Sequence, residues 1–307
     1  MTTRLATISA GGGTAGGATR VGLVLDDGAA LDGPAAARAA GIDPAPLSDM
    51  VETIAAWDRL GPVLRAAAAA PPPGAVLAKG AYTLRAPIPR PRKNVFCVGR
   101  NYIEHVAEGD RAAGRETEVP KYPQFFTKPP TAVIGPDETV PCYAAITRVL
   151  DYEVELALVI GRRGSDIPAE RAFEHVFGYT VANDITARDL QRRHGQWFKG
   201  KGLDRSCPLG PWIVPADEIA SPPDLRISLT VNGELRQDSR TTQLIFDIPT
   251  IIATLSQGLT FETGDIIATG TPSGVGYAMT PPCVLAPGDV IEATVEGIGT
   301  LRTTVVA

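Results

Sequence analysis

An apolar run at residues 151–160, DYEVELALVI, carries two glutamates two positions apart. Side chains alternate across a strand, so Glu153 and Glu155 are expected on the same face, with Asp151 beside them. Two ionised carboxylates on one apolar face repel each other and are costly to desolvate. A bound cation removes both costs, and oxygen-only ligands indicate a hard metal such as Mg²⁺, Mn²⁺ or Ca²⁺. The alternative is a strand edge with both glutamates in water.

A third carboxylate, Asp184, stands where a predicted strand over Val176–Ala182 gives way to a predicted helix over Thr186–Arg193. Together with Glu153 and Glu155 it would complete a metal-ligand set with positions left open for substrate or water. Open positions suit catalysis, because a closed structural site leaves none free. The alternative role for Asp184 is the N-cap of the following helix.

The chain has three histidines, of which His105 has the most promising neighbour. If residues 102–108 are helical, His105 and Glu108 are three apart and adjacent on one face. A carboxylate beside an imidazole orients it and raises its basicity, which produces a general base for water. A helical ion pair at the surface is the alternative. His175 and His194 stand in polar helical contexts and are expected to face solvent.

Three other segments carry possible chemistry. Lys199 and Lys201 lie between aromatics and glycines in the run WFKGKG, where a lysine can have a lowered pKa or hold an anionic oxygen. Residues 268–276, ATGTPSGVG, form a glycine- and hydroxyl-rich turn that can offer N–H groups to a carboxylate. The charged segment Gly109–Pro120 has the composition of a mobile loop, either a lid over substrate or a tolerated insertion.

Bulk properties of the 307-residue chain exclude several classes of function. Its net charge of −5 and pI near 5.4 favour neither nucleic acid nor an anionic membrane. Its apolar stretches are far shorter than the roughly 20 residues of a membrane span, and the N-terminus lacks the apolar core of a secretory signal. Four scattered cysteines without a C-x-x-C pair predict no zinc site but four buried, reduced thiols in a cytoplasmic protein.

Residues 1–80 predict a small α+β domain. Its expected elements are a strand at Arg4–Ile8, a loop at 14–17, a hairpin of Arg20–Leu25 with Ala29–Leu31, a helix capped by Ser48 and running to Arg59, a break at Gly61-Pro62, and an alanine-rich helix to Ala70. The proline run Pro71–Gly74 then ends this unit as a stiff linker.

Residues 81–307 predict an α+β domain with few helices and a large mixed or antiparallel sheet system. The expected strands are Asn94–Val98, Gln124–Thr127, Glu153–Ile160, Val176–Ala182, Leu225–Val231, Ile266–Thr269, Val290–Val295 and Gly299–Val305. Besides the helix at Thr186–Arg193, helices are expected at Pro168–His175 and Pro249–Gln257.

Taken together, the chain resembles the fumarylacetoacetate hydrolase family over about residues 85–305. The matching stretches occur in the family's order: GRNY at 99–102 with His105 and Glu108, FTKP at 126–129, DYEVEL at 151–156, NDITARD at 183–189, NGE at 232–234, and the turn at 269–276. The resemblance implies a mixed β-roll or β-sandwich catalytic domain in a homodimer, with one Mg²⁺ or Mn²⁺ per subunit and Ca²⁺ as a possible substitute in crystals.

Site roles follow from the matching positions. The resemblance implies Glu153, Glu155 and Asp184 as metal ligands, His105 and Glu108 as the water-activating pair, and Lys201 as the active-site lysine. It also implies four substrate-binding positions: Arg100, Tyr102, Gln191 and Thr271.

The expected activity is hydrolysis of a C–C bond in a 3-acylpyruvate or related β-diketo acid, through a metal-stabilised pyruvate enolate. In that reaction His105 would take a proton from water and Lys201 would stabilise the oxyanion. The alternative is decarboxylation or isomerisation of oxaloacetate or a related dioate at the same site. A non-catalytic metal- or ligand-binding protein is a third possibility, disfavoured because it would need neither His105, Glu108 nor Lys201.

Overall fold

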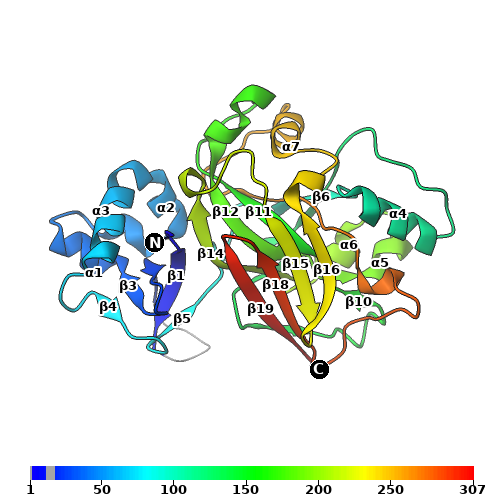
Figure 1. Ribbon diagram of the computed structural model, residues 1–307, viewed down its shortest axis with the longest axis horizontal. Helices are drawn as coiled ribbons and strands as arrows, with labels where there is room; N and C mark the ends of the chain where they lie inside the picture. The colour runs from blue at the N-terminus through cyan, green and yellow to red at the C-terminus, as the bar shows by residue number, and fades with distance from the viewer. Residues whose placement is uncertain (1, 12–17) are drawn as a thin grey trace.

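The structure is a computed structural model that describes residues 2–11 and 18–307, so the loop predicted at 14–17 lies outside the described residues. Figure 1 shows a smaller N-terminal part beside a larger part that contains the remaining sheets. The predicted α+β class is confirmed, with much sheet and few helices. In the part of the chain described, no helix combines the length and the apolar character needed to cross a membrane.

The N-terminal part is a small sheet covered by helices (Figure 1). Its strands are β1 (Leu5–Ala10), β2 (Thr19–Val24), β3 (Ala30–Asp32), β4 (Val76–Leu77) and β5 (Tyr82–Leu84), and its helices are α1 (Gly33–Ala39), α2 (Met50–Ala55) and α3 (Trp57–Ala69), with a 3₁₀ turn η1 (Ala45–Ser48). The predicted hairpin is confirmed, because β2 and β3 pair antiparallel.

Two helix boundaries in this part were predicted wrongly. Asp49, not Ser48, caps α2, because its carboxylate accepts the N–H groups of Val51 (2.8 Å) and Glu52 (3.1 Å). The helix α3 also continues through Pro62, so Gly61-Pro62 is no break. Pro62 is exposed, and the carbonyl that loses its helical partner can bond water instead.

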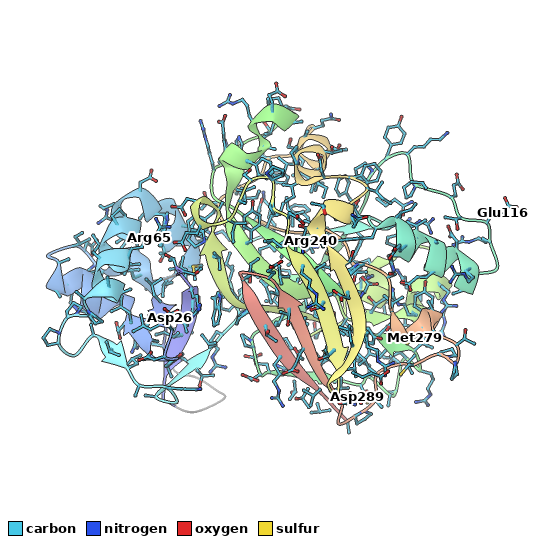
Figure 2. The ribbon with its side chains drawn as sticks, viewed as in Figure 1. Asp26, Arg65, Glu116, Arg240, Met279 and Asp289 are labelled. Atoms are coloured by element: carbon cyan, nitrogen blue, oxygen red, sulfur yellow. The ribbon has the colours of Figure 1, made fainter. Side chains whose placement is uncertain are left out.

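One sheet runs through both parts of the molecule. Its main path is β4-β3-β2-β1-β14-β12-β11-β17-β6-β7, with β5 paired to β1 and β8 to β14. The junction is the pairing of β1 with β14, and Arg65 of α3, labelled in Figure 2, adds ion pairs to Asp217 (2.8 Å) and Glu218 (3.1 Å). Because the sheet is continuous, the division of the chain at residue 80 stays a prediction.

The larger part packs this sheet against a second sheet of order β16-β15-β18-β19-β9. The strands of the first sheet are β6 (Val95–Gly99), β7 (Gln124–Lys128), β8 (Val133–Ile134), β11 (Val154–Ile160), β12 (Val176–Asn183), β14 (Cys207–Pro215) and β17 (Ile266–Ala268). Those of the second are β9 (Thr139–Pro141), β15 (Arg226–Val231), β16 (Glu234–Arg240), β18 (Val290–Val295) and β19 (Gly299–Val306). A short pair, β10 (Leu150–Asp151) with β13 (Thr186–Ala187), lies apart.

Helices of the larger part lie to the right of the sheets and above them in the view of Figure 1. They are α4 (Ile103–Ala112), α5 (Arg188–Arg193), α6 (Phe198–Lys201) and α7 (Ile248–Leu255), with 3₁₀ turns η2 (Pro130–Ala132), η3 (Ala169–His175), η4 (Ala216–Glu218), η5 (Thr241–Gln243) and η6 (Gly276–Ala278). The segment predicted as a helix at Pro168–His175 is thus a 3₁₀ helix, and the one predicted from Thr186 begins at Arg188, after the bridge to β10.

The sequence also failed to predict β14, although this strand lies inside the sheet between β1 and β12. Pro208, Pro211 and Pro215 lie within it, and proline is normally confined to edge strands and bulges. The cysteine prediction was half right. All four thiols are free in the described chain, but Cys142 and Cys283 are only partly buried.

Candidate functional site

Three carboxylates meet where β11 begins and β12 ends. Val154 of β11 pairs with Asn183 of β12, so Glu153, Glu155 and Asp184 come together at the same edge of the sheet. One oxygen from each lies within 4.8 Å of the others, and all three side chains are buried. The alternative of water-facing glutamates is therefore wrong. Asp184 is also no N-cap, because α5 starts four residues later without a side-chain cap.

Two lysines neutralise part of this cluster. Lys201 Nζ donates to Glu153 (2.8 Å) and Asp184 (2.6 Å), and Lys128 Nζ donates to Asp184 (2.6 Å) and to the carbonyl of Ile185 (3.0 Å). Burial disfavours the charged form of Lys201, but Asp184 and Glu153 outweigh it and raise the pKa of Lys201. The reading of a lysine with a lowered pKa is therefore wrong, and Lys201 remains a cation.

Glu153 and Glu155 have opposite electrostatic surroundings. Burial opposes ionisation of Glu153, but Lys201 and Arg188 outweigh it and lower its pKa to about 2. Burial raises the pKa of Glu155 well above its ordinary value, and the charges of Asp184 and Glu153 raise it further. Its hydrogen bond from the Gly270 N–H (2.7 Å) does not offset these effects.

Among residues 2–11 and 18–307, no cationic side chain forms an ion pair with Glu155, although Lys201 lies near enough to act on its pKa. Three buried carboxylate oxygens of this kind form the donor set that Mg²⁺ and Mn²⁺ prefer. A hard dication beside them would remove the cost of ionising Glu155. The residues present thus fit a divalent metal, and the structure itself gives no preference between the two ions.

Lys128 was not predicted as a site residue, although it follows a predicted strand in the run FTKP. Its side chain is fully buried and carries the ion pair to Asp184. We expect Lys128→Met to lower the free energy of unfolding by about 3 kcal/mol, because it removes one of the two buried lysines that compensate the Asp184 carboxylate. Chemical denaturation measures this loss. Lys121→Met, at an exposed lysine, serves as the control, and equal stability of the two variants would contradict the prediction.

The predicted histidine pair lies on α4, which confirms the helix expected at 102–108. His105 Nδ1 is 2.8 Å from Glu108 Oε1, and the Gly274 N–H donates to the other oxygen of Glu108 at 2.9 Å. A carboxylate oxygen accepts in such a bond, so Nδ1 is the donor and Nε2 is the ring nitrogen left to face a ligand. The His105 side chain is 11% exposed, which does not fit a surface ion pair.

Asp110, near the C-terminal end of α4, bonds this helix to the segments before and after it. It accepts a bidentate pair from Arg100 (2.9 and 2.8 Å), a bond from Arg115 (3.2 Å) and the N–H of Glu118 (3.1 Å). The segment predicted as a loop at Gly109–Pro120 is therefore helical to Ala112 and then bonded back to Asp110. Figure 2 shows Glu116 on the outer side of this loop.

The Arg100 guanidinium holds the pKa of the Asp110 carboxyl at about 2, below its ordinary 3.8. A depressed pKa contributes stability above the unfolded value, and that stability disappears as the pH falls through the folded value. We therefore expect Asp110→Asn to lower the free energy of unfolding by roughly 1–2 kcal/mol at neutral pH. The difference from the parent should vanish between about pH 4 and 2 in denaturation curves. A difference that persists at pH 2 would contradict it.

A cavity of about 280 Å³ lies between the carboxylate cluster and His105, and both Glu153 and His105 line it. The predicted site residues that line it are Arg100, His105, Glu153, Gln191, Lys201 and Thr271. Tyr102 is not among them. Its extended backbone at the start of α4 directs the ring into the core, where its hydroxyl has no hydrogen-bond partner among residues 2–11 and 18–307. The expected contact of Tyr102 with substrate and the roles of the other residues stay predictions.

Several residues at the cavity were not predicted. Arg188 is buried and donates to Asp151 (2.9 Å) and Glu153 (2.5 Å), and Tyr277 stacks on its guanidinium at 4.5 Å. Trp197 packs against Gly99, where an added Cβ would lie 2.1 Å from its ring. Arg188 belongs to the run NDITARD, so the sequence could have identified it as a site residue. No sequence pattern predicts the contact of Trp197 with Gly99.

Of the remaining two histidine predictions one is confirmed and one is wrong, and the two lysines of the WFKGKG run differ in burial. His194 is exposed as expected, but the prediction for His175 is wrong, because it is buried with Nδ1 2.9 Å from the carbonyl of Arg162. Lys199 is exposed while Lys201 is buried among carboxylates, which distinguishes the two lysines of the WFKGKG run.

Residues 94–306 match the sequence profile described as fumarylacetoacetate (FAA) hydrolase C-terminal. The oxaloacetate tautomerase YisK of Bacillus subtilis is 52% identical over 218 residues, which are 71% of each chain. The human mitochondrial oxaloacetate tautomerase FAHD2A is 44% identical over 234 residues, which are 75% of this chain and 72% of that protein.

Solved structures extend the similarity to nearly the whole chain. A fumarylacetoacetate hydrolase from Exiguobacterium antarcticum has 38% identity and a TM-score of 0.80, covering 99% of both chains. A maleylpyruvate hydrolase from Sphingobium sp. SYK-6, in complex with manganese(II) and pyruvate, has 33% identity and a TM-score of 0.74, covering 99% of this chain and 98% of its own.

Proposed function

Because this chain belongs to the fumarylacetoacetate hydrolase family, we propose that it is an oxaloacetate tautomerase, which interconverts the enol and keto forms of oxaloacetate. The observation that carries the proposal is the 52% identity to a bacterial oxaloacetate tautomerase over 71% of the chain. This favours the oxaloacetate alternative above acylpyruvate hydrolysis, which was the first expectation from the sequence.

The carboxylate cluster supports the enolate chemistry that tautomerisation needs. Glu153, Glu155 and Asp184 would hold Mg²⁺ or Mn²⁺, which supplies positive charge to an oxygen that gains electron density on enolisation. Lys201 holds Glu153 and Asp184 in place from one side of the cluster, and Arg188 holds Glu153 from the other.

The pair of His105 and Glu108 supports the proton transfer that tautomerisation requires. Conversion of enol to keto removes a proton from the hydroxyl oxygen on C2 and adds one to C3, so no water is consumed. Nε2 of His105 is the basic atom at the cavity, because Nδ1 is bonded to Glu108. Nε2 would take the proton from oxygen and return it to carbon. The Gly274 N–H donates to the second oxygen of Glu108, which keeps this carboxylate, and with it the His105 imidazole, oriented.

Oxaloacetate is a small dianion, and the cavity suits it in charge and size. Five cationic side chains line a space of about 280 Å³, namely Arg100, Arg115, Arg188, Arg192 and Lys201. Among the described residues that line the cavity Glu153 is the one carboxylate, so cationic groups are in excess there and attract an anionic ligand.

The test is a rate measurement on the purified protein. The decay of enol oxaloacetate to the keto form is followed by absorbance with Mg²⁺, with Mn²⁺ and with EDTA, and pyruvate release is measured in parallel. We expect metal-dependent acceleration of tautomerisation above the buffer rate. Decay at the buffer rate with either metal would refute the proposal, and pyruvate release alone would indicate a decarboxylase.

Acylpyruvate hydrolysis is the second candidate, favoured by the position of His105, which is bonded to Glu108, at the same cavity as Lys201. In that reaction His105 would activate water and Lys201 would stabilise the oxyanion. The similarity to a maleylpyruvate hydrolase adds support. Acetate and pyruvate formed in equal amounts from acetylpyruvate would establish it.

Assembly as a homodimer and a cytoplasmic location stay predictions.

A further inference from the structure

The cationic side chains that line the cavity differ in how far their charge is already compensated. Arg100 and Arg115 share Asp110, at 2.8 and 3.2 Å. Arg188 is paired with Asp151 and Glu153, and Lys201 with Glu153 and Asp184. In the described ranges, 2–11 and 18–307, Arg192 is the cation at the cavity without a carboxylate within 4.0 Å, and its charge is available to a ligand.

The backbone and an aromatic ring hold the Arg192 side chain. Its Nε donates to the carbonyl of Arg188 at 3.4 Å, and its guanidinium lies 5.4 Å from the centre of the Tyr277 ring. That ring also carries Arg188 at 4.5 Å, and the Tyr277 N–H donates to Asp151 at 3.2 Å. Because this platform is anchored, Arg192 loses less conformational entropy when it binds an anion than a free surface arginine would.

Arg188 and Arg192 line the same cavity at different depths. Arg188 and Arg192 are four residues apart on α5, so they lie on one face, with their backbones about 6 Å apart along the helix axis. Arg188 contacts Glu153 of the carboxylate cluster, whereas Arg192 lies farther out towards solvent. Both guanidinium groups contact the Tyr277 ring, and Glu153 and Arg192 line the same cavity. Three carbon–carbon bonds of about 1.5 Å each separate the carboxyl carbons of a four-carbon diacid, so one molecule in this cavity can present one carboxylate to the cluster and the other to Arg192.

We infer that Arg192 is the specificity-determining residue that binds the distal carboxylate of a four-carbon 2-oxo diacid. The guanidinium fork pairs with a carboxylate through two parallel hydrogen bonds, which distinguishes a diacid from a 2-oxo monoacid. This inference rests on the proposed function, since it names the group by which the same site recognises oxaloacetate.

The test compares two ligands and three variants on the Mn²⁺-loaded protein. The dissociation constants of oxaloacetate and pyruvate are measured by titration calorimetry for the parent, Arg192→Gln and Arg192→Lys. Arg193→Gln is the matched control, because Arg193 is the next residue of the same helix, is exposed and does not line the cavity. Arg192→Lys keeps the charge without the fork and covers the case in which Arg192→Gln does not fold.

We expect Arg192→Gln to weaken oxaloacetate binding by roughly 10- to 100-fold, the loss of one charge-assisted hydrogen-bonded pair. Pyruvate binding should be unchanged, Arg192→Lys should give an intermediate loss, and Arg193→Gln should match the parent. Unchanged oxaloacetate binding in both Arg192 variants, or equal losses for the two ligands, would overturn the inference.

The same measurements separate the two proposals. If the parent does not accelerate tautomerisation but binds oxaloacetate through Arg192, the proposed function fails and the subsite stands. If the parent is a tautomerase and the Arg192 variants bind oxaloacetate as the parent does, the function stands and the subsite fails. A parent that binds neither ligand overturns both.

Discussion

Glu155→Gln is expected to weaken Mn²⁺ binding roughly 100-fold or more and to abolish metal-dependent turnover. The amide keeps the shape of the side chain and can still accept the Gly270 N–H, but it removes the negative charge that attracts the cation. Glu155 is the carboxylate of the cluster with the raised pKa, so it is the one that needs a metal most. Titration calorimetry with Mn²⁺ measures the loss directly.

The same variant has a second expected signature, in stability. An acid whose pKa is raised in the folded state destabilises the protein as the pH rises above the unfolded value, because the folded state holds the proton more tightly. Without metal, Glu155→Gln should therefore unfold at the same or a higher temperature than the parent at neutral pH. Asp265→Asn, at a buried carboxylate paired with Lys93 at 2.9 Å, is the control. It should lose stability and keep its Mn²⁺ affinity. If Glu155→Gln keeps its Mn²⁺ affinity and Asp265→Asn loses it, Glu155 is not a metal ligand.

His105→Gln is expected to lower kcat for oxaloacetate tautomerisation by about 10²–10⁴-fold, the usual contribution of a general acid–base group. Binding of Mn²⁺ should be unchanged, because His105 bonds Glu108 and does not belong to the carboxylate cluster. Steady-state rates together with Mn²⁺ titration distinguish this loss of proton transfer from a loss of metal.

Two further variants control the His105 experiment. His194→Gln changes an exposed histidine of the same chain and should leave the rate unchanged. Glu108→Gln keeps the imidazole but weakens its orientation, so a smaller loss than in His105→Gln is expected. If His105→Gln turns over oxaloacetate at the parent rate, Nε2 of His105 is not the atom that moves the proton, and another group of the cavity must do so.

Much of the candidate site follows from spacing inside single elements. Residues two apart in an extended chain share a face, which brings Glu153, directly before β11, to Glu155, and residues three apart on a helix are neighbours, which brings His105 to Glu108. Because these periodicities are local, the sequence was sufficient for both pairs. Local patterns also predicted most strands, but they failed for β14, whose prolines contradict the usual signal of a strand inside a sheet.

The sequence by itself thus determined the kinds of chemical group and their pairing within each element. Only the tertiary structure decided which pairs meet in one cavity, since this depends on strand register and on packing between distant segments. The pairing of Val154 with Asn183 brings Asp184 to the glutamates. Contacts with Glu153 and Asp184 distinguish the buried Lys201 from the exposed Lys199, and the end of β7 brings Lys128 to Asp184. Such contacts join residues far apart along the chain, where no sequence period specifies a neighbour.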